Sequence, residues 1–111
     1  MELSMNDLSA VEDSVDALLI CLRDKTVLKE DSIVAFKDSL IEAADIVHNC
    51  LSNPDLHIND SGLSEYDRLL LRIRGDLIAA TSFLLMGFID EVVRNLASAK
   101  SAIAGIKSLG E

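Results

Sequence analysis

The chain of 111 residues carries nineteen acidic and ten basic side chains, which give a formal net charge of −9 at neutral pH. This length suits one domain with a real hydrophobic core but not two, so we expect a single domain over residues 1–111. The negative charge disfavours direct binding to nucleic acid or to an anionic membrane, because both repel an acidic surface. Half of the residues are apolar, yet aromatic residues are few and Trp is absent, so we expect an aliphatic core of packed helices.

Features of localisation favour the cytoplasm. The first residues, Met1 to Ser4, lack the basic segment and apolar run of a secretion signal. No stretch approaches the roughly 18 apolar residues that a membrane-spanning helix needs. The two cysteines, Cys21 and Cys50, lie inside helical patterns and not at the spacing of a metal site or a disulfide framework. We therefore expect buried thiols in a reducing compartment and no membrane segment.

Helical periodicity begins near the start of the chain, where apolar residues recur at steps of three and four. The pattern predicts a helix over about residues 6–24 and another over about residues 30–52, which stops before Pro54 because proline cannot continue a helix. The apolar positions of these two helices are Leu8, Val11, Val15, Leu18 and Leu22, followed by Ile33, Phe36, Leu40, Ala44, Val47 and Leu51. Each helix thus has one face for a shared core.

Residues 53–63 are expected to form one long loop, because they include the only Pro of the chain together with Gly, Asp, Asn and Ser. Loops of this length are often functional. The alternative, which we favour, is that Leu56, Ile58 and Leu63 close the open end of a helical bundle.

Two further helices follow this loop. Ser64 is a good N-cap for a helix over about residues 65–86, and a fourth helix is expected over about residues 89–108. Their apolar positions are Tyr66, Leu70, Ile73, Leu77, Ala80 and Leu84, followed by Ile89, Val92, Leu96, Ala99, Ile103 and Ile106. Such steps of three and four are typical of helices that pack nearly parallel in a bundle.

The junction between the last two helices decides the architecture. Met86-Gly87-Phe88 fits a helix end, because Gly readily takes the left-handed backbone conformation. The chain is then all-α, a four-helix up-down bundle of antiparallel helical hairpins, which we favour. An apolar heptad nevertheless runs through Gly87 from Leu71 to Ile106. The alternative is therefore three helices, with one long C-terminal helix that forms a coiled-coil dimer.

A second apolar stripe on the third helix suggests how the protein acts. Leu71, Ile78 and Leu85 lie roughly 90° or more from the core-facing stripe, at about 100° per residue. An exposed apolar stripe marks a partner interface, whereas the alternative is a helix buried on two sides within its own bundle. Our first hypothesis is a non-enzymatic adaptor, regulatory or scaffold protein. It contacts another protein or itself through this stripe, as a homo-oligomer and most simply a dimer.

The residues around the junction also form a recognisable series. They are Ala80, Phe83, Gly87, Asp90, Glu91, Val92, Leu96 and Ala99. This order of small, aromatic, glycine, acidic and apolar positions resembles the turn of a tetratricopeptide repeat. The resemblance covers one hairpin, no second copy occurs in the chain, and Val92 stands where the repeat usually has Ala. It implies a helical hairpin and a protein-binding role.

The sharpest catalytic pattern is a pair of acidic motifs, Asp13-x-x-Asp16 and Glu42-x-x-Asp45. It resembles the paired motifs of the all-helical nucleotide pyrophosphohydrolases, although the first motif of that family normally uses Glu. The resemblance implies that these carboxylates hold Mg²⁺ and a nucleoside triphosphate. On a helical wheel, however, Asp13 and Glu42 lie nearly opposite the apolar centres of their helices. We therefore favour a solvated acidic surface without a cofactor, and keep the enzyme as the alternative function.

Overall fold

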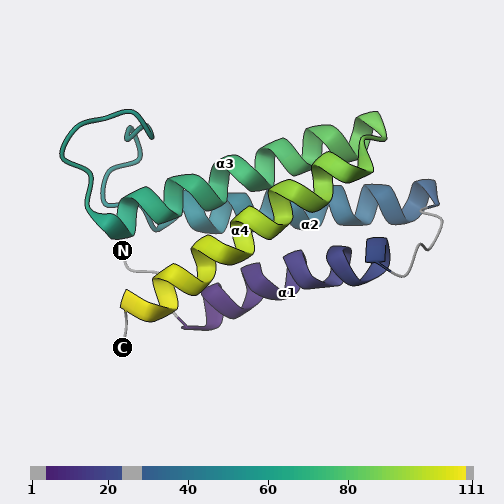
Figure 1. The fold of residues 1–111 in the computed structure, drawn as a ribbon, viewed down its shortest axis with the longest axis horizontal. Helices are drawn as coiled ribbons and strands as arrows, with labels where there is room; N and C mark the ends of the chain where they lie inside the picture. The colour runs from purple at the N-terminus through teal and green to yellow at the C-terminus, as the bar shows by residue number, and fades with distance from the viewer. Residues whose placement is uncertain (1–4, 24–28, 110–111) are drawn as a thin grey trace.

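The computed structural model describes residues 5–23 and 29–109 and shows an antiparallel bundle of four helices (Figure 1). The helices are α1 (Met5–Arg23), α2 (Glu30–Asn49), α3 (Glu65–Met86) and α4 (Ile89–Leu109). The α2–α3 loop lies at the end of the bundle where α1 begins, and the α3–α4 turn lies at the opposite end. The described residues contain no strand, so the predicted all-α up-down four-helix bundle is confirmed.

The predicted helix limits are close to the observed ones, with one clear difference at the end of α2. The helix ends at Asn49 and not near residue 52, because the backbone N–H groups of Cys50 and Leu51 bond three residues back, at 3.1 and 3.2 Å. Such tighter bonds close the last turn of a helix before the chain turns away. The predicted end of the first helix, at residue 24, lies outside the described residues.

The core is aliphatic and extends along the whole bundle. Every helix contributes side chains that are at most 1 % exposed, and none of the buried core residues in the described part of the chain is aromatic. The largest of these fully buried side chains are Val11, Val15, Leu18, Leu40, Val47, Leu70, Ile73, Leu77, Val92, Leu96 and Ile103. Burying one such side chain contributes about 1.5–3 kcal/mol, so this shared face holds the four helices together.

The helices form a ring in which each contacts two neighbours. α1 packs against α2 and α4, while α3 packs against α2 and α4, so α1 and α3 lie on one diagonal. Two ion pairs between described residues join α1 to α4. Lys100 pairs with Asp16 at 2.6 Å and Lys107 pairs with Glu12 at 2.9 Å. The ring order places the groove between α2 and α3 on the opposite side of the bundle from the groove between α1 and α4.

The α3–α4 turn confirms the predicted hairpin. Gly87 has φ of 81°, the left-handed conformation, and its N–H donates to the carbonyl oxygen of Leu84 at 3.2 Å. The N–H of Phe88 donates to the carbonyl oxygen of Phe83 at 2.9 Å, and the rings of these two residues lie 6.2 Å apart. Together these contacts form the Schellman motif that ends a helix at glycine. The alternative of one long C-terminal helix through Gly87 is therefore wrong.

Candidate functional site

The most distinctive surface feature is a groove between α2 and α3, with a volume of about 310 Å³. Ile41 from α2 and Ile78 from α3 stand on its two sides, 46 % and 45 % exposed. Both lie outside the core-facing series of their helices, so their side chains reach the surface. The residues that line the groove are Ile41, Ala44, Asp45, Arg74, Ile78, Thr81 and Ser82.

Two more exposed aliphatic residues lie two helical turns further along the bundle. Val34 lies seven residues before Ile41, and Leu85 lies seven residues after Ile78. Because α2 and α3 run in opposite directions, both steps lead the same way along the groove, by about 10 Å at 1.5 Å per residue. Val34 and Leu85 are 45 % and 58 % exposed. We define the α2–α3 face as these four aliphatic side chains: Ile41 and Ile78 line the groove, and the antiparallel register places Val34 and Leu85 at one level beyond it.

The predicted stripe on α3 is only partly at the surface. Ile78 and Leu85 are exposed, whereas Leu71 is 8 % exposed and belongs to the buried core. Reasoning from the sequence missed Val34 and Ile41 as their neighbours. The signal was present, since these two residues stand seven apart and off the core-facing series of α2, but only the packing shows that Ile41 lines the same groove as Ile78.

One end of the groove carries two opposite charges. Asp45 and Arg74 both line it, each one helical turn beyond the isoleucine of its own helix. In the described part of the chain, neither side chain makes a hydrogen bond or an ion pair. Their charges therefore remain available to a partner.

The acidic pairs of the pyrophosphohydrolase hypothesis do not converge. Asp16 points to the α4 side of α1, where it pairs with Lys100, while Asp45 lines the groove on the opposite side of the bundle. Asp13 and Glu42 are exposed on their own helices. Among the residues that the structure describes, no three His, Cys, Asp or Glu side chains are placed to hold a metal ion.

A buried carboxylate ties the two ends of the α2–α3 loop together. Asp67 is 6 % exposed; it accepts hydrogen bonds from the Ser52 hydroxyl at 2.6 Å and the Ser52 N–H at 3.1 Å. The Ser64 hydroxyl also donates to it at 3.1 Å, while its own N–H donates to Ser64 Oγ at 3.0 Å. The bonds from Ser52 and Ser64 outweigh burial and hold the pKa of Asp67 below its usual value. This cluster is a structural clamp whose hydrogen-bonding capacity is already used.

A second carboxylate lies in the α3–α4 interface. Burial raises the pKa of Asp76, although the Ser98 hydroxyl and the Arg72 guanidinium partly oppose this shift. Its Oδ2 atom is buried and has no hydrogen-bond partner, while Arg72 donates to Ser98 Oγ at 3.1 and 3.2 Å. Such a group costs stability and offers no set of ligands.

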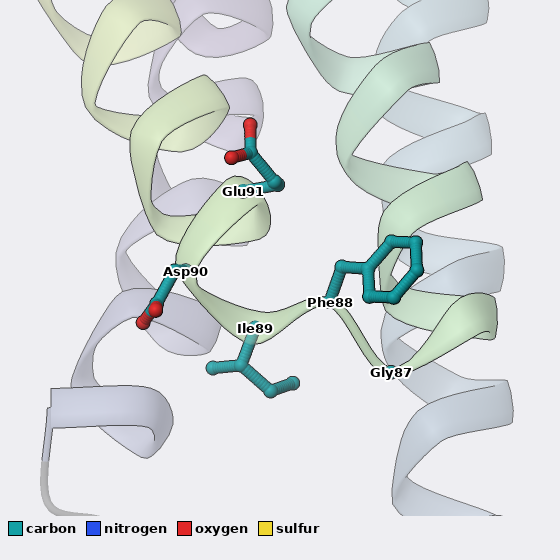
Figure 2. Close-up of a pocket in the computed structure, with 5 residues that line it drawn as sticks. All are labelled: Gly87, Phe88, Ile89, Asp90 and Glu91. Carbon is teal, nitrogen blue, oxygen red and sulfur yellow. The ribbon is translucent and has the colours of Figure 1, made fainter.

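Two other hollows differ from the α2–α3 groove. Figure 2 shows the one at the α3–α4 turn, about 440 Å³, where the Phe88 ring points towards α3 and the Ile89 side chain points away from the helices. It is lined only by the consecutive residues 87–91, so it brings no distant groups together. The groove between α1 and α4, about 580 Å³, exposes Ile20 and Val93, but its lysine and aspartate already form an ion pair.

In the described part of the chain, the α2–α3 face thus combines four exposed aliphatic side chains with two unused charges of opposite sign. No helix in the described part of the chain is long and apolar enough to cross a membrane. Comparisons of this chain with protein-family models, curated proteins and solved structures find no significant match.

Proposed function

We propose that this protein is a non-enzymatic interaction module, an adaptor or scaffold that docks a helical surface against the α2–α3 face. The observation that carries the proposal is the exposed pair Ile41 and Ile78, which line one groove. Exposed Val34 and Leu85 lie two helical turns further along the same two helices. In an isolated chain these side chains stay in contact with water. Covering them contributes about 25 cal/mol per Å² of apolar area, which gives docking a driving force.

The spacing of the face suits a helix as the docking element. The two apolar pairs lie about 10 Å apart along the groove, which equals two turns of a helix. A partner helix with apolar residues every seven positions would place one of them at each pair. Ridges of such a helix pack into a groove between two helices at an interaxial distance of about 8–10 Å.

Other features support a role without catalysis, a cytoplasmic location and a preference among partners. The four carboxylates of the enzymatic alternative, Asp13, Asp16, Glu42 and Asp45, are spread over separate faces of the bundle, which favours a role without catalysis. Two free cysteines are consistent with a cytoplasmic location. The net charge of −9 favours basic over acidic proteins among other partners.

The proposal is tested by site-specific cross-linking in the cells that produce the protein. A photo-reactive amino acid replaces Ile78 in one variant and Ile20, on the opposite groove, in a matched control. We expect defined adducts from position 78, either with another protein or with the same chain, and none of the same mass from position 20. The purified adduct partner should then bind about tenfold more weakly to Ile41→Glu than to Ile20→Glu, in keeping with the loss of a buried anchor.

Two results would contradict the proposal. One is the absence of adducts at position 78, or the same adducts at both positions. The other is Mg²⁺-dependent hydrolysis of nucleoside triphosphates that is lost in Glu42→Ala, since only the pyrophosphohydrolase requires that carboxylate.

A further inference from the structure

We infer that the occupant of the α2–α3 face is a second copy of this chain, packed about a two-fold axis that runs parallel to the groove. This inference rests on the proposed function and names the partner of that surface. Contacts about a two-fold axis use the same patch on both copies, so the patch must be complementary to itself. The residues of the α2–α3 face, together with Asp45 and Arg74, meet this condition.

The apolar part of the face satisfies the condition through its register. A half-turn about an axis parallel to the helices keeps every residue at its level and lays α2 of one copy on α3 of the other. Ile41 then faces Ile78 of the second copy, and Val34 faces Leu85 of the second copy. All four aliphatic side chains of the α2–α3 face in each copy become covered by aliphatic side chains.

The charges of Asp45 and Arg74 are also complementary to themselves about this axis. Asp45 lies four residues after Ile41, and Arg74 lies four residues before Ile78, so the two charges share one level of the antiparallel pair. The same half-turn brings Asp45 of each copy opposite Arg74 of the other and forms two intermolecular ion pairs. Neither residue has a partner among the described residues of its own chain, so no existing pair must break.

The other two-fold arrangement is electrostatically unfavourable. An axis that crosses the helices would lay α2 on α2 of the second copy and would pair Ile41 with Val34. Along α2 the same register would bring Asp45 opposite Glu30 of the second copy, two acids facing each other. This register also places Lys37 opposite Asp38, but these two residues already pair within one chain at 3.5 Å. Like charges placed together across an interface are disfavoured, whereas the axis parallel to the groove gives Asp45 and Arg74 a partner that they lack, so that axis is preferred.

The size of the face predicts a dimer of modest affinity. α2 and α3 contain 20 and 22 residues, and each is therefore about 30 Å long. Two helices side by side are about 20 Å wide, which gives about 600 Å² per copy and about 1,200 Å² in total. This total is at the lower end of stable interfaces. Each copy also carries a net charge of −9, which opposes association until salt screens it.

The test is a charge-reversal experiment read by sedimentation equilibrium at physiological salt. We expect the wild type to dimerise with increasing concentration. Asp45→Arg and Arg74→Asp should each weaken dimerisation about tenfold or more, because each places two like-charged pairs in the interface. An equimolar mixture of the two variants should restore it, since one ion pair of the heterodimer is then the native one and the other has both of its charges reversed.

A matched control for Asp45→Arg is Asp13→Arg, which raises the net charge by the same amount at an exposed position of α1. It should dimerise at least as well as the wild type, and circular dichroism should show that every variant remains helical. The mixture also separates the intermolecular pair from an intramolecular one, because mixing cannot repair a pair within one chain.

Three results would overturn the inference. They are a wild type that stays monomeric at several hundred micromolar, single variants that dimerise as tightly as Asp13→Arg, or a mixture that stays as weak as the single variants. These three results would leave the proposed function standing, because that function is tested separately by cross-linking at position 78. Adducts at this position with a different protein would retain the docking role and exclude the second copy.

Discussion

The carboxylate of Asp67 is expected to stabilise the fold by holding both ends of the α2–α3 loop on the first turn of α3. The test is Asp67→Asn, which keeps the size of the side chain and removes its charge. In Asn one oxygen remains to accept the Ser52 N–H, while an NH₂ group replaces the oxygen that accepts the two serine hydroxyls. The NH₂ group can donate to these hydroxyl oxygens in place of accepting from them, so the variant keeps its bonds only in neutral, weaker form.

The magnitude follows from the three bonds that the carboxylate accepts. Two come from Ser52, at 2.6 and 3.1 Å, and one comes from Ser64 at 3.1 Å. A hydrogen bond to a charged group contributes about 1.5–3 kcal/mol net, and a carboxylate in the first turn of a helix adds about 0.3–1 kcal/mol. Replacing three charge-assisted bonds by neutral ones, each about 1 kcal/mol weaker, predicts a destabilisation of about 3 kcal/mol at pH 7. Equilibrium urea unfolding measures this as a fall of about 2 M in the midpoint.

The penalty should also depend on pH in a defined direction. The pKa of Asp67 in the folded protein is held below its usual value of 3.8, mainly by the hydrogen bond from the Ser52 hydroxyl. The stability that the carboxylate contributes is therefore complete above the unfolded pKa and is lost as the pH falls through the lower folded pKa. The difference between wild type and Asp67→Asn should be constant from about pH 5 to 8 and shrink below about pH 4.

Glu65→Gln is the matched control, because Glu65 lies in the same first turn of α3 but is exposed and reaches neither end of the loop. It should change stability by no more than about 0.5 kcal/mol. An Asp67→Asn penalty no larger than that of Glu65→Gln, or one that increases on acidification, would refute the clamp.

Three further substitutions can be tested by the same measurement of urea unfolding. Gly75→Ala should raise stability by about 0.5–1 kcal/mol, because Gly75 is exposed inside α3 and an added methyl group meets no atom within 4 Å; an unchanged midpoint would argue against this. Gly87→Ala should lower stability by about 1 kcal/mol or more despite equally open space, because its φ of +81° strains any residue with a Cβ atom, and a neutral result would contradict the strain. Asp76→Asn should raise the midpoint at pH 7, because burial raises the pKa of this carboxyl and the charged form destabilises the fold. That penalty is present above the raised pKa and disappears as the pH falls to the unfolded value, so a gain that persists at pH 3 would contradict the assignment.

The helices and their order could be predicted from the sequence because their signals are local. Steps of three and four between apolar residues define one buried face on each helix, and the residues predicted for these faces are buried or pack against the core. The exception is Ile89, which is 37 % exposed because it lies at the first position of α4, beside the turn. The predicted caps also hold: Ser64 Oγ accepts the N–H of Asp67, and Gly87 ends α3 in the left-handed conformation. These features depend on neighbours a few residues apart, which is why the sequence alone determines them.

The tertiary structure decided which residues outside the core faces are covered. Leu71, Ile78 and Leu85 share one stripe in sequence, yet only Leu71 is buried, because exposure depends on the distance to neighbouring helices and not on helical period. The placement of Ile41 beside Ile78 and the bond from Ser52 to Asp67 join residues distant along the chain. Only the antiparallel packing of α2 on α3 brings such residues together, and it alone forms the candidate docking face.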